Sequence, residues 1–232
     1  MFLKFTTIDN IRDLGGIQTA DGHTIVLNRL FRSSDLHKLS KKELDILKKD
    51  DDLRVVIDFR STKSSIDRRD LIDESIKYYH KYTLKFLETN SYNEEITVDP
   101  DEFFKDVYRR LALQEEAIEA YRKFFRLIIE NEEGAILWHC TSGKDRTGIA
   151  AALLLRVLGC DMETIYQQHF RTNEITVPIL KEKLKEIAHK DSLTGLLNRR
   201  AAIYFLEKAI SSSLSCLLYT SDAADDLLCV VL

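Results

Sequence analysis

Residues 135–158 read AILWHCTSGKDRTGIAAALLLRVL, and this stretch decides the fold. Its opening apolar run predicts a buried strand that ends at His139. Small and polar residues follow, and the chain from Thr147 to Leu158 is then apolar on almost every side, as in a buried helix. A strand, a short loop and a helix in this order are typical of α/β proteins, in which ligands bind at the carboxyl ends of the strands.

The flanking segments extend the same alternation of strands and helices. A second buried strand is predicted at 54–58, a β-rich stretch at 78–84 and a loop at 85–100. Helices are predicted over 40–47, 101–130 and 161–171, with another beginning at Pro178. We therefore predict an α/β fold with a mostly parallel central sheet flanked by helices, and a helical C-terminal extension.

The composition of the chain limits the classes of function that need to be considered. The chain has 232 residues, of which 44% are hydrophobic, and a net charge of −4, so nothing indicates nucleic acid as a partner. The spacing of its four cysteines fits neither a disulfide framework nor a zinc site, which predicts reduced thiols and a cytoplasmic protein. No signal peptide and no membrane span are expected, so export would need a route without a signal peptide.

The loop between the predicted strand and helix is suited to binding an anion. Its backbone N–H groups and the helix N-terminus attract negative charge, and Gly143 allows a tight turn. A thiolate at Cys140 would be stabilised by the same groups and would serve as a nucleophile toward phosphorus. Arg146, six residues later, can hold two phosphate oxygens, and Thr147 offers a hydroxyl beside the sulfur.

Each of these residues also has an ordinary structural interpretation when taken alone. A single buried cysteine is usually inert core, and a single arginine near a helix start usually lies on the surface. The combination His-Cys-x-x-Gly-x-x-Arg-Thr-Gly is different, because its chance occurrence in a chain of this length is on the order of one in 100,000 or rarer. The pattern as a whole therefore favours a catalytic loop.

The loop resembles the Cys-x5-Arg signature of the protein tyrosine phosphatase superfamily, in the Gly-Lys-Asp-Arg-Thr-Gly form of its bacterial atypical tyrosine, dual-specificity and lipid phosphatases. Three upstream segments are similar to motifs of the same group: NIRDLGG at 10–16, LFRSSDL at 30–36 and VIDFRS at 56–61. The resemblance covers about 8–175. It implies a phosphatase-like fold and activity on phosphotyrosine, or on phosphoserine, phosphothreonine or phosphoinositides, as monoesters.

The resemblance also implies roles for individual residues. Cys140 would form a phosphocysteine intermediate and Arg146 would bind the phosphate, with no metal and no other cofactor. The remaining loop residues are expected to bind phosphate: Thr141, Ser142, Gly143, Lys144 and Thr147. One departure leaves substrate preference open, since 62–65 reads TKSS where the group usually has a glutamate.

The general acid has several candidates in the sequence. A leaving oxygen needs a proton donor, and Asp145 within the loop is our first candidate, as in phosphatases with a Gly-x-Asp-Arg loop. Asp58 at a strand end, and Asp99 and Asp101 in the polar segment, are the alternatives.

Three further residues are possible accessories to the site. His139 is expected to brace the loop through hydrogen bonds, with its side chain directed away from the sulfur. Asp58 and Arg60 could contribute to the site, although an aspartate after a strand often only caps the next turn. Lys144 could favour multiply phosphorylated lipid head groups or could be a solvated lysine.

The C-terminal part predicts a division of the chain. Residues 191–200, DSLTGLLNRR, resemble the start of a GGDEF diguanylate cyclase domain, but the catalytic turn of that family is absent. Residues from 216 resemble a translated sequencing adapter. The predicted parts are a phosphatase domain at 1–175, a helical linker or domain end at 176–190, a truncated GGDEF-like segment at 191–214 and an artefactual disordered tail at 215–232.

A cysteine-dependent phosphatase is thus the predicted function, with a phosphorylated protein or phosphoinositide as substrate. Two alternatives remain open at this point. One is a catalytically weak phosphatase-like module that binds phosphorylated ligands, and the other is a regulatory fragment of a cyclic-dinucleotide signalling protein. The sequence does not indicate an oligomeric state.

Overall fold

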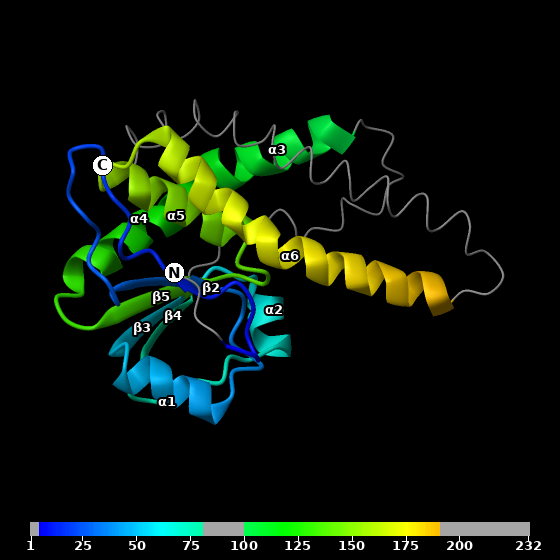
Figure 1. Ribbon diagram of the computed structural model, residues 1–232, viewed down its shortest axis with the longest axis horizontal. Coiled ribbons are helices and arrows are strands. Elements are labelled where there is room, and N and C mark those ends of the chain that lie inside the picture. The colour runs from blue at the N-terminus through cyan, green and yellow to red at the C-terminus, as the bar shows by residue number, and fades with distance from the viewer. Residues whose placement is uncertain (1–4, 81–99, 191–232) are drawn as a thin grey trace.

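The computed structural model describes residues 5–80 and 100–190 (Figure 1). Its strands form one five-stranded sheet in the order β1-β2-β5-β3-β4. β1 runs antiparallel to β2, and the other neighbours pair in parallel, so the prediction of a mostly parallel sheet is confirmed. The strands are β1 (Arg12–Asp13), β2 (Leu30–Ser33), β3 (Leu53–Asp58), β4 (Lys77–His80) and β5 (Ala135–His139).

Helices cover both faces of the sheet, as Figure 1 shows. α1 lies on one face, while α3, α4, α5 and α6 lie on the other, and the short α2 follows β3. The predicted flanking helices and C-terminal helix are therefore confirmed. The helices are α1 (Lys41–Lys49), α2 (Thr62–Asp67), α3 (Pro100–Leu113), α4 (Glu115–Glu130), α5 (Asp145–Val157) and α6 (Met162–Lys190).

The core is divided between the two faces by the alternation of side chains along each strand. Ile57 of β3 and Trp138 of β5 belong to the larger cluster beneath α4 and α5. Their neighbours Val56 and Leu137 point to the opposite face, where they join Leu47 of α1. Both central strands are buried on both faces, which explains why they read as continuous apolar runs.

The helix boundaries differ from the predicted ones in two places. The helix predicted over 101–130 is two helices, because Gln114 adopts an extended conformation and caps α4. The predicted helices at 161–171 and from Pro178 are one helix, α6, with Pro178 inside it. Proline in a helix interior costs about 3 kcal/mol, but it removes only one N–H donor, and the remaining turns of α6 continue on both sides.

Other local predictions can be compared directly. The capping box that starts α1 is present, since Ser40 accepts from the Glu43 N–H at 3.2 Å. β1, β2 and α2 were not predicted, and Pro100, placed in a loop, begins α3. Residues 81–99 and 191–232, with the expectations made for them, lie outside the described residues. In the part that is described, no helix has the length and apolar character needed to cross a membrane.

Candidate active site

The candidate catalytic loop lies where the carboxyl ends of three parallel strands meet. β5 ends at His139, the loop begins at Cys140, and α5 starts at Asp145. Neighbouring segments fix the start of the loop, because the Asp35 N–H donates to the Thr141 carbonyl at 3.2 Å and the Phe59 N–H donates to the His139 carbonyl at 2.9 Å. The strand–loop–helix arrangement predicted for this stretch is therefore present.

Gly143 brings the loop close to the backbone at the end of β2. It has a φ of +64°, in the left-handed region that favours glycine. A Cβ atom at this position would lie 2.3 Å from the Ser33 carbonyl oxygen and 2.7 Å from the Ser34 nitrogen. The loop therefore rests directly on the backbone that follows β2, and no side chain fits there.

Cys140, the first residue of the loop, is 2% exposed. Thr147 is also buried, and its hydroxyl has no hydrogen-bond partner among the described residues. The backbone at Thr147 is fixed by the Trp138 indole N–H, which donates to its carbonyl at 3.2 Å. The unused hydroxyl, in the first turn of α5, remains available to the thiolate or to a bound phosphate oxygen.

Arg146 is half-buried in the first turn of α5. Its Nη1 donates to the Phe59 carbonyl at 3.1 Å, and the Phe59 ring packs in the core against Tyr121 and Phe124. This hydrogen bond uses one guanidinium nitrogen and fixes the orientation of the Arg146 side chain. The remaining donors of the fork can bind the oxygens of an anion.

Lys144 is the last residue of the loop, and Asp145 is the first residue of α5. Both are half-buried, and the Asp145 carboxylate accepts a hydrogen bond from the hydroxyl of Tyr108 in α3. Ser142 is exposed, and Thr141 is half-buried. Of the other acids considered, Asp99 and the side chain of Asp101 lie outside the described residues.

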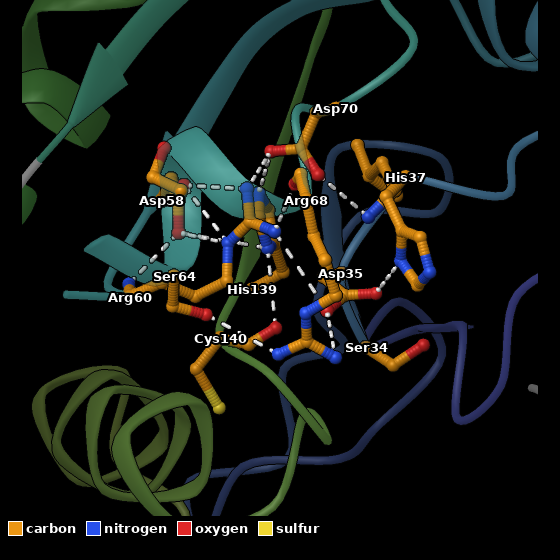
Figure 2. A network of polar contacts seen from close by, with 12 residues as sticks. Ser34, Asp35, His37, Asp58, Arg60, Ser64, Arg68, Asp70, His139 and Cys140 are labelled. Carbon is orange, nitrogen blue, oxygen red and sulfur yellow. Dashed lines mark hydrogen bonds and ion pairs between the residues drawn. The ribbon is translucent and has the colours of Figure 1, made fainter. Parts of the chain in front are cut away.

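Behind the loop lies a buried group of charged side chains, Asp58, Arg60, Asp70 and His139, here called the ionic network (Figure 2). Arg60 contacts both carboxylates, with Nη2 at 2.8 Å from Asp58 Oδ2 and 2.6 Å from Asp70 Oδ2. His139 Nε2 lies 3.1 Å from the same Asp70 oxygen. In Figure 2 the sulfur of Cys140 points away from this network.

The charges of the ionic network stabilise one another. Burial disfavours the charged form of His139, but its contacts with Asp70 and Asp58 outweigh burial and raise its pKa. Burial would also raise the pKa of Asp58, yet His139 and Arg60 hold it well below its usual value. The acids Asp58 and Asp70 lie close enough to His139 to form a possible cation site, but the guanidinium of Arg60 already lies between the two carboxylates.

A second group of polar side chains approaches the loop from β1 and β2. Asn10 Nδ2 donates to the Gly143 carbonyl at 2.8 Å, and Arg32 Nη2 donates to the same oxygen at 2.8 Å. Arg12 contacts the Asn10 side chain and reaches α6 through the Gln168 carbonyl. Sequence reasoning identified the two motifs that contain these residues but gave Asn10 and Arg32 no role at the loop.

Asp70 and Tyr108 were missed altogether by sequence reasoning. Neither lies in a recognised motif. Asp70 lies in the loop between α2 and β4, and Tyr108 lies on α3, so only the folded chain brings them to the ionic network and to Asp145. No spacing in the sequence signals such a contact.

Comparison with known proteins identifies the family to which the chain belongs. The model of the tyrosine phosphatase family matches residues 3–225. A putative tyrosine-protein phosphatase of Cupriavidus necator is 30% identical over 182 residues, which are 74% of this chain and 63% of that protein. The triple specificity protein phosphatase PtpB of Mycobacterium tuberculosis is 27% identical over 77% of this chain and 71% of its own length.

A solved structure, the core catalytic domain of the PP-IP phosphatase SIW14 from S. cerevisiae, matches with a TM-score of 0.42 and 14% identity, covering 72% of this chain and 77% of that one. The chain spans less than two thirds of the length of the Cupriavidus relative. The match of the family model, by contrast, extends over nearly the whole chain and includes the loop described above. This chain belongs to the tyrosine phosphatase family.

Proposed function

We propose that the protein is a cysteine-dependent phosphatase that hydrolyses phosphotyrosine through a phosphocysteine intermediate. The observation that carries this proposal is the placement of Cys140 and Arg146. The nucleophile follows the carboxyl end of β5, the arginine lies in the first turn of α5, and a glycine-containing loop joins them. Such a loop and helix N-terminus attract a dianion to the sulfur.

The reaction follows from this geometry in two steps. The Cys140 thiolate attacks phosphorus, an S–P bond forms, and the P–O bond to the substrate breaks as the leaving oxygen takes a proton. Water then attacks the phosphocysteine and passes a proton to the carboxylate that the general acid has become. The S–P bond breaks, and inorganic phosphate and the thiolate are released. Arg146 neutralises charge on the equatorial oxygens in both steps, and the Thr147 hydroxyl is available to the departing sulfur.

Asp145 is the proposed general acid. It is half-buried beside the nucleophile loop and accepts a hydrogen bond from Tyr108, which fixes its orientation. Asp58 is a poorer candidate, because Arg60 and His139 hold its pKa low and its carboxylate ionised. An ionised, fully engaged carboxylate has no proton to give to a leaving group.

The wider substrate range is also a proposal. The Mycobacterium relative is named a triple specificity protein phosphatase, so phosphoserine and phosphothreonine are candidate substrates beside phosphotyrosine. The cation of Lys144 at the loop keeps phosphoinositides among the candidates. The remaining loop residues would bind the phosphate: Thr141, Ser142, Gly143, Lys144 and Thr147. A cytoplasmic location, proposed from the cysteine content, fits phosphorylated proteins or lipid head groups as partners.

Turnover of p-nitrophenyl phosphate in the presence of a chelator tests the function. The wild type should release phosphate and be inhibited by vanadate, and Cys140→Ser should lower kcat by at least about 10⁴-fold while it still binds phosphotyrosine peptide. Metal-independent turnover that survives in Cys140→Ser would rule out the mechanism. Binding of the peptide by the wild type without any phosphate release would identify a binding module instead.

The role of Asp145 needs a comparison of leaving groups. Asp145→Asn should lower kcat by about 100-fold for phenyl phosphate, whose leaving oxygen needs a proton, and by much less for p-nitrophenyl phosphate. Asp106→Asn, also on α3, is the matched control, because its half-exposed carboxylate pairs with Arg110 at 2.7 Å. Equal losses for both substrates would show that Asp145 supports the loop but donates no proton.

A further inference from the structure

The carbonyl of Gly143 is held by two buried side chains from outside the loop. Asn10 Nδ2 and Arg32 Nη2 each donate to it at 2.8 Å, and Asn10 Nδ2 also lies 3.2 Å from the Ser142 carbonyl. Asn10 is 2% exposed and Arg32 is 1% exposed. A carbonyl oxygen has two lone pairs, so these donors satisfy it fully.

Fixing these carbonyls also fixes the direction of the loop N–H groups. In a planar trans peptide, the C=O of one residue and the N–H of the next point in opposite directions. No cis peptide occurs in the ranges 5–80 and 100–190. Because the Ser142 and Gly143 carbonyls are drawn toward Asn10 and Arg32, the N–H groups of Gly143 and Lys144 point to the opposite side of the chain. Donation toward a bound oxyanion requires this orientation.

Asn10 is specifically suited to this position. It has a φ of +57°, in the left-handed region that asparagine tolerates better than most residues. Its side-chain oxygen accepts from Arg12, which leaves the NH₂ group to face the loop. Arg12 is itself anchored to α6 by the Gln168 carbonyl and the Thr172 hydroxyl, each at 3.0 Å. The orientation of the amide is therefore determined by its neighbours.

Arg32 adds a buried positive charge to the same contact. No carboxylate lies within ion-pair distance of its guanidinium in the described part of the chain. Burial lowers the pKa of Arg32 to about 10, against the opposing effect of Cys140 and Asp145, so the guanidinium is charged at neutral pH. A Cβ atom on Gly148 would lie 3.5 Å from Arg32 Nη2, which places the charge against the first turns of α5.

We propose that Asn10 and Arg32, here called the carbonyl clamp, are positioning residues that set the affinity of the loop for the phosphoryl group. They do so by holding the Ser142 and Gly143 carbonyls away from the anion. This inference rests on the proposed phosphatase function. It assigns a task to two motifs, at 10–16 and 30–36, that lie outside the Cys-x5-Arg signature.

Asn10→Asp is the sharpest test, because it keeps the size of the side chain, the tolerance of a left-handed backbone and an oxygen for Arg12. It removes the NH₂ donor to the loop. The inhibition constant of vanadate and the KM for p-nitrophenyl phosphate should both rise by at least about tenfold, the effect of losing one buried hydrogen bond or more. Asn28→Asp is the matched control, since Asn28 also has a left-handed φ, of +56°, but is exposed and lies outside the loop contacts.

Asn10→Gly keeps the test decisive if the aspartate variant does not fold. Glycine accepts the same backbone conformation and introduces no charge, so it should reproduce the loss of vanadate affinity. Unchanged vanadate inhibition and KM in a folded Asn10 variant, with only a lower Tm or less active protein, would overturn the inference and leave a structural role. Failure of the wild type to release phosphate would count against the proposed function instead, and the two outcomes are distinct.

Discussion

The catalytic loop is supported from two sides by groups of opposite electrostatic character. On the side of β3 and β4, the cations of the ionic network are matched by buried carboxylates, and Arg60 contacts two of them. On the side of β1 and β2, Arg32 binds a carbonyl, and no carboxylate within the described ranges pairs with it. The first group is neutralised internally, whereas the second leaves positive charge beside the loop.

The pKa values of two histidines shift in opposite directions on the two sides of the loop. His139 lies in the ionic network, and its carboxylate neighbours raise its pKa in spite of its burial. His169 of α6 lies near the carbonyl clamp. Burial, Arg32, Lys144 and Arg12 outweigh the opposing effect of Asp145 and lower its pKa to about 3. One side of the loop therefore favours a proton and the other excludes it. A paired cation contributes chiefly to folding, and an unpaired one is available to an anion.

Removing Arg60 should produce the largest loss of stability. Arg60→Met would leave the buried carboxylates of Asp58 and Asp70 without their guanidinium partner, which typically costs about 3–5 kcal/mol. Urea unfolding followed by tryptophan fluorescence would measure the free energy of unfolding, and the exposed Arg54→Met serves as control. A loss below about 1 kcal/mol would mean that the network contributes little to the fold.

Removing Arg32 should have the opposite pattern of effects: little change in stability and a clear loss of phosphate binding. Arg32→Met relieves the desolvation of an unpaired cation, and Asn10 still donates to the Gly143 carbonyl, so the free energy of unfolding should change by about 1 kcal/mol or less. Vanadate affinity should nevertheless fall by about tenfold, as measured by inhibition of p-nitrophenyl phosphate hydrolysis. A large loss of stability with unchanged vanadate affinity would show that both sides of the loop are merely structural.

Replacing His169 should give the smallest effect, a change in how the free energy of unfolding depends on pH. Its folded pKa, about 3, lies below the usual histidine value, so the unfolded chain binds the proton first as pH falls below about 6.5. Its stabilising contribution is full above that pH and decreases toward pH 3. Between pH 8 and pH 6 the wild type should lose about 0.8 kcal/mol more than His169→Gln. Parallel pH profiles of the two proteins would contradict the positive environment inferred here.

The central fold was predictable because its elements carry strong local signals. β3 and β5 are short apolar runs buried on both faces, and α1 has a complete capping box at Ser40 and Glu43. β1 and β2 were missed because they are short and polar, with Arg12 and Arg32 buried in them. Arg32 contacts the loop, and Arg12 contacts Asn10 and α6. No local pattern in the sequence encodes these tertiary contacts.

The site was predictable only where its chemistry is contiguous in sequence. Cys140 and Arg146 lie on one loop, so their spacing alone is enough to indicate an anion site. Asp70 and Tyr108 come from distant segments and meet the loop only after folding. The roles proposed for Cys140, Asp145 and Arg146 are still predictions. The same holds for the accessory roles of His139, Asp58 and Arg60.

The double contact at the Gly143 carbonyl has a consequence for how such proteins diverge. Positions 10, 12 and 32 act on one oxygen atom through a chain of hydrogen bonds that reaches α6. A change at one of them is tolerable only with a compensating change at another, so descendants of a common ancestor should keep or exchange the three together. Positions 58, 60 and 70 should vary together as a separate group, since an exchange of charge at one position can be compensated by the opposite exchange at its ion-pair partner.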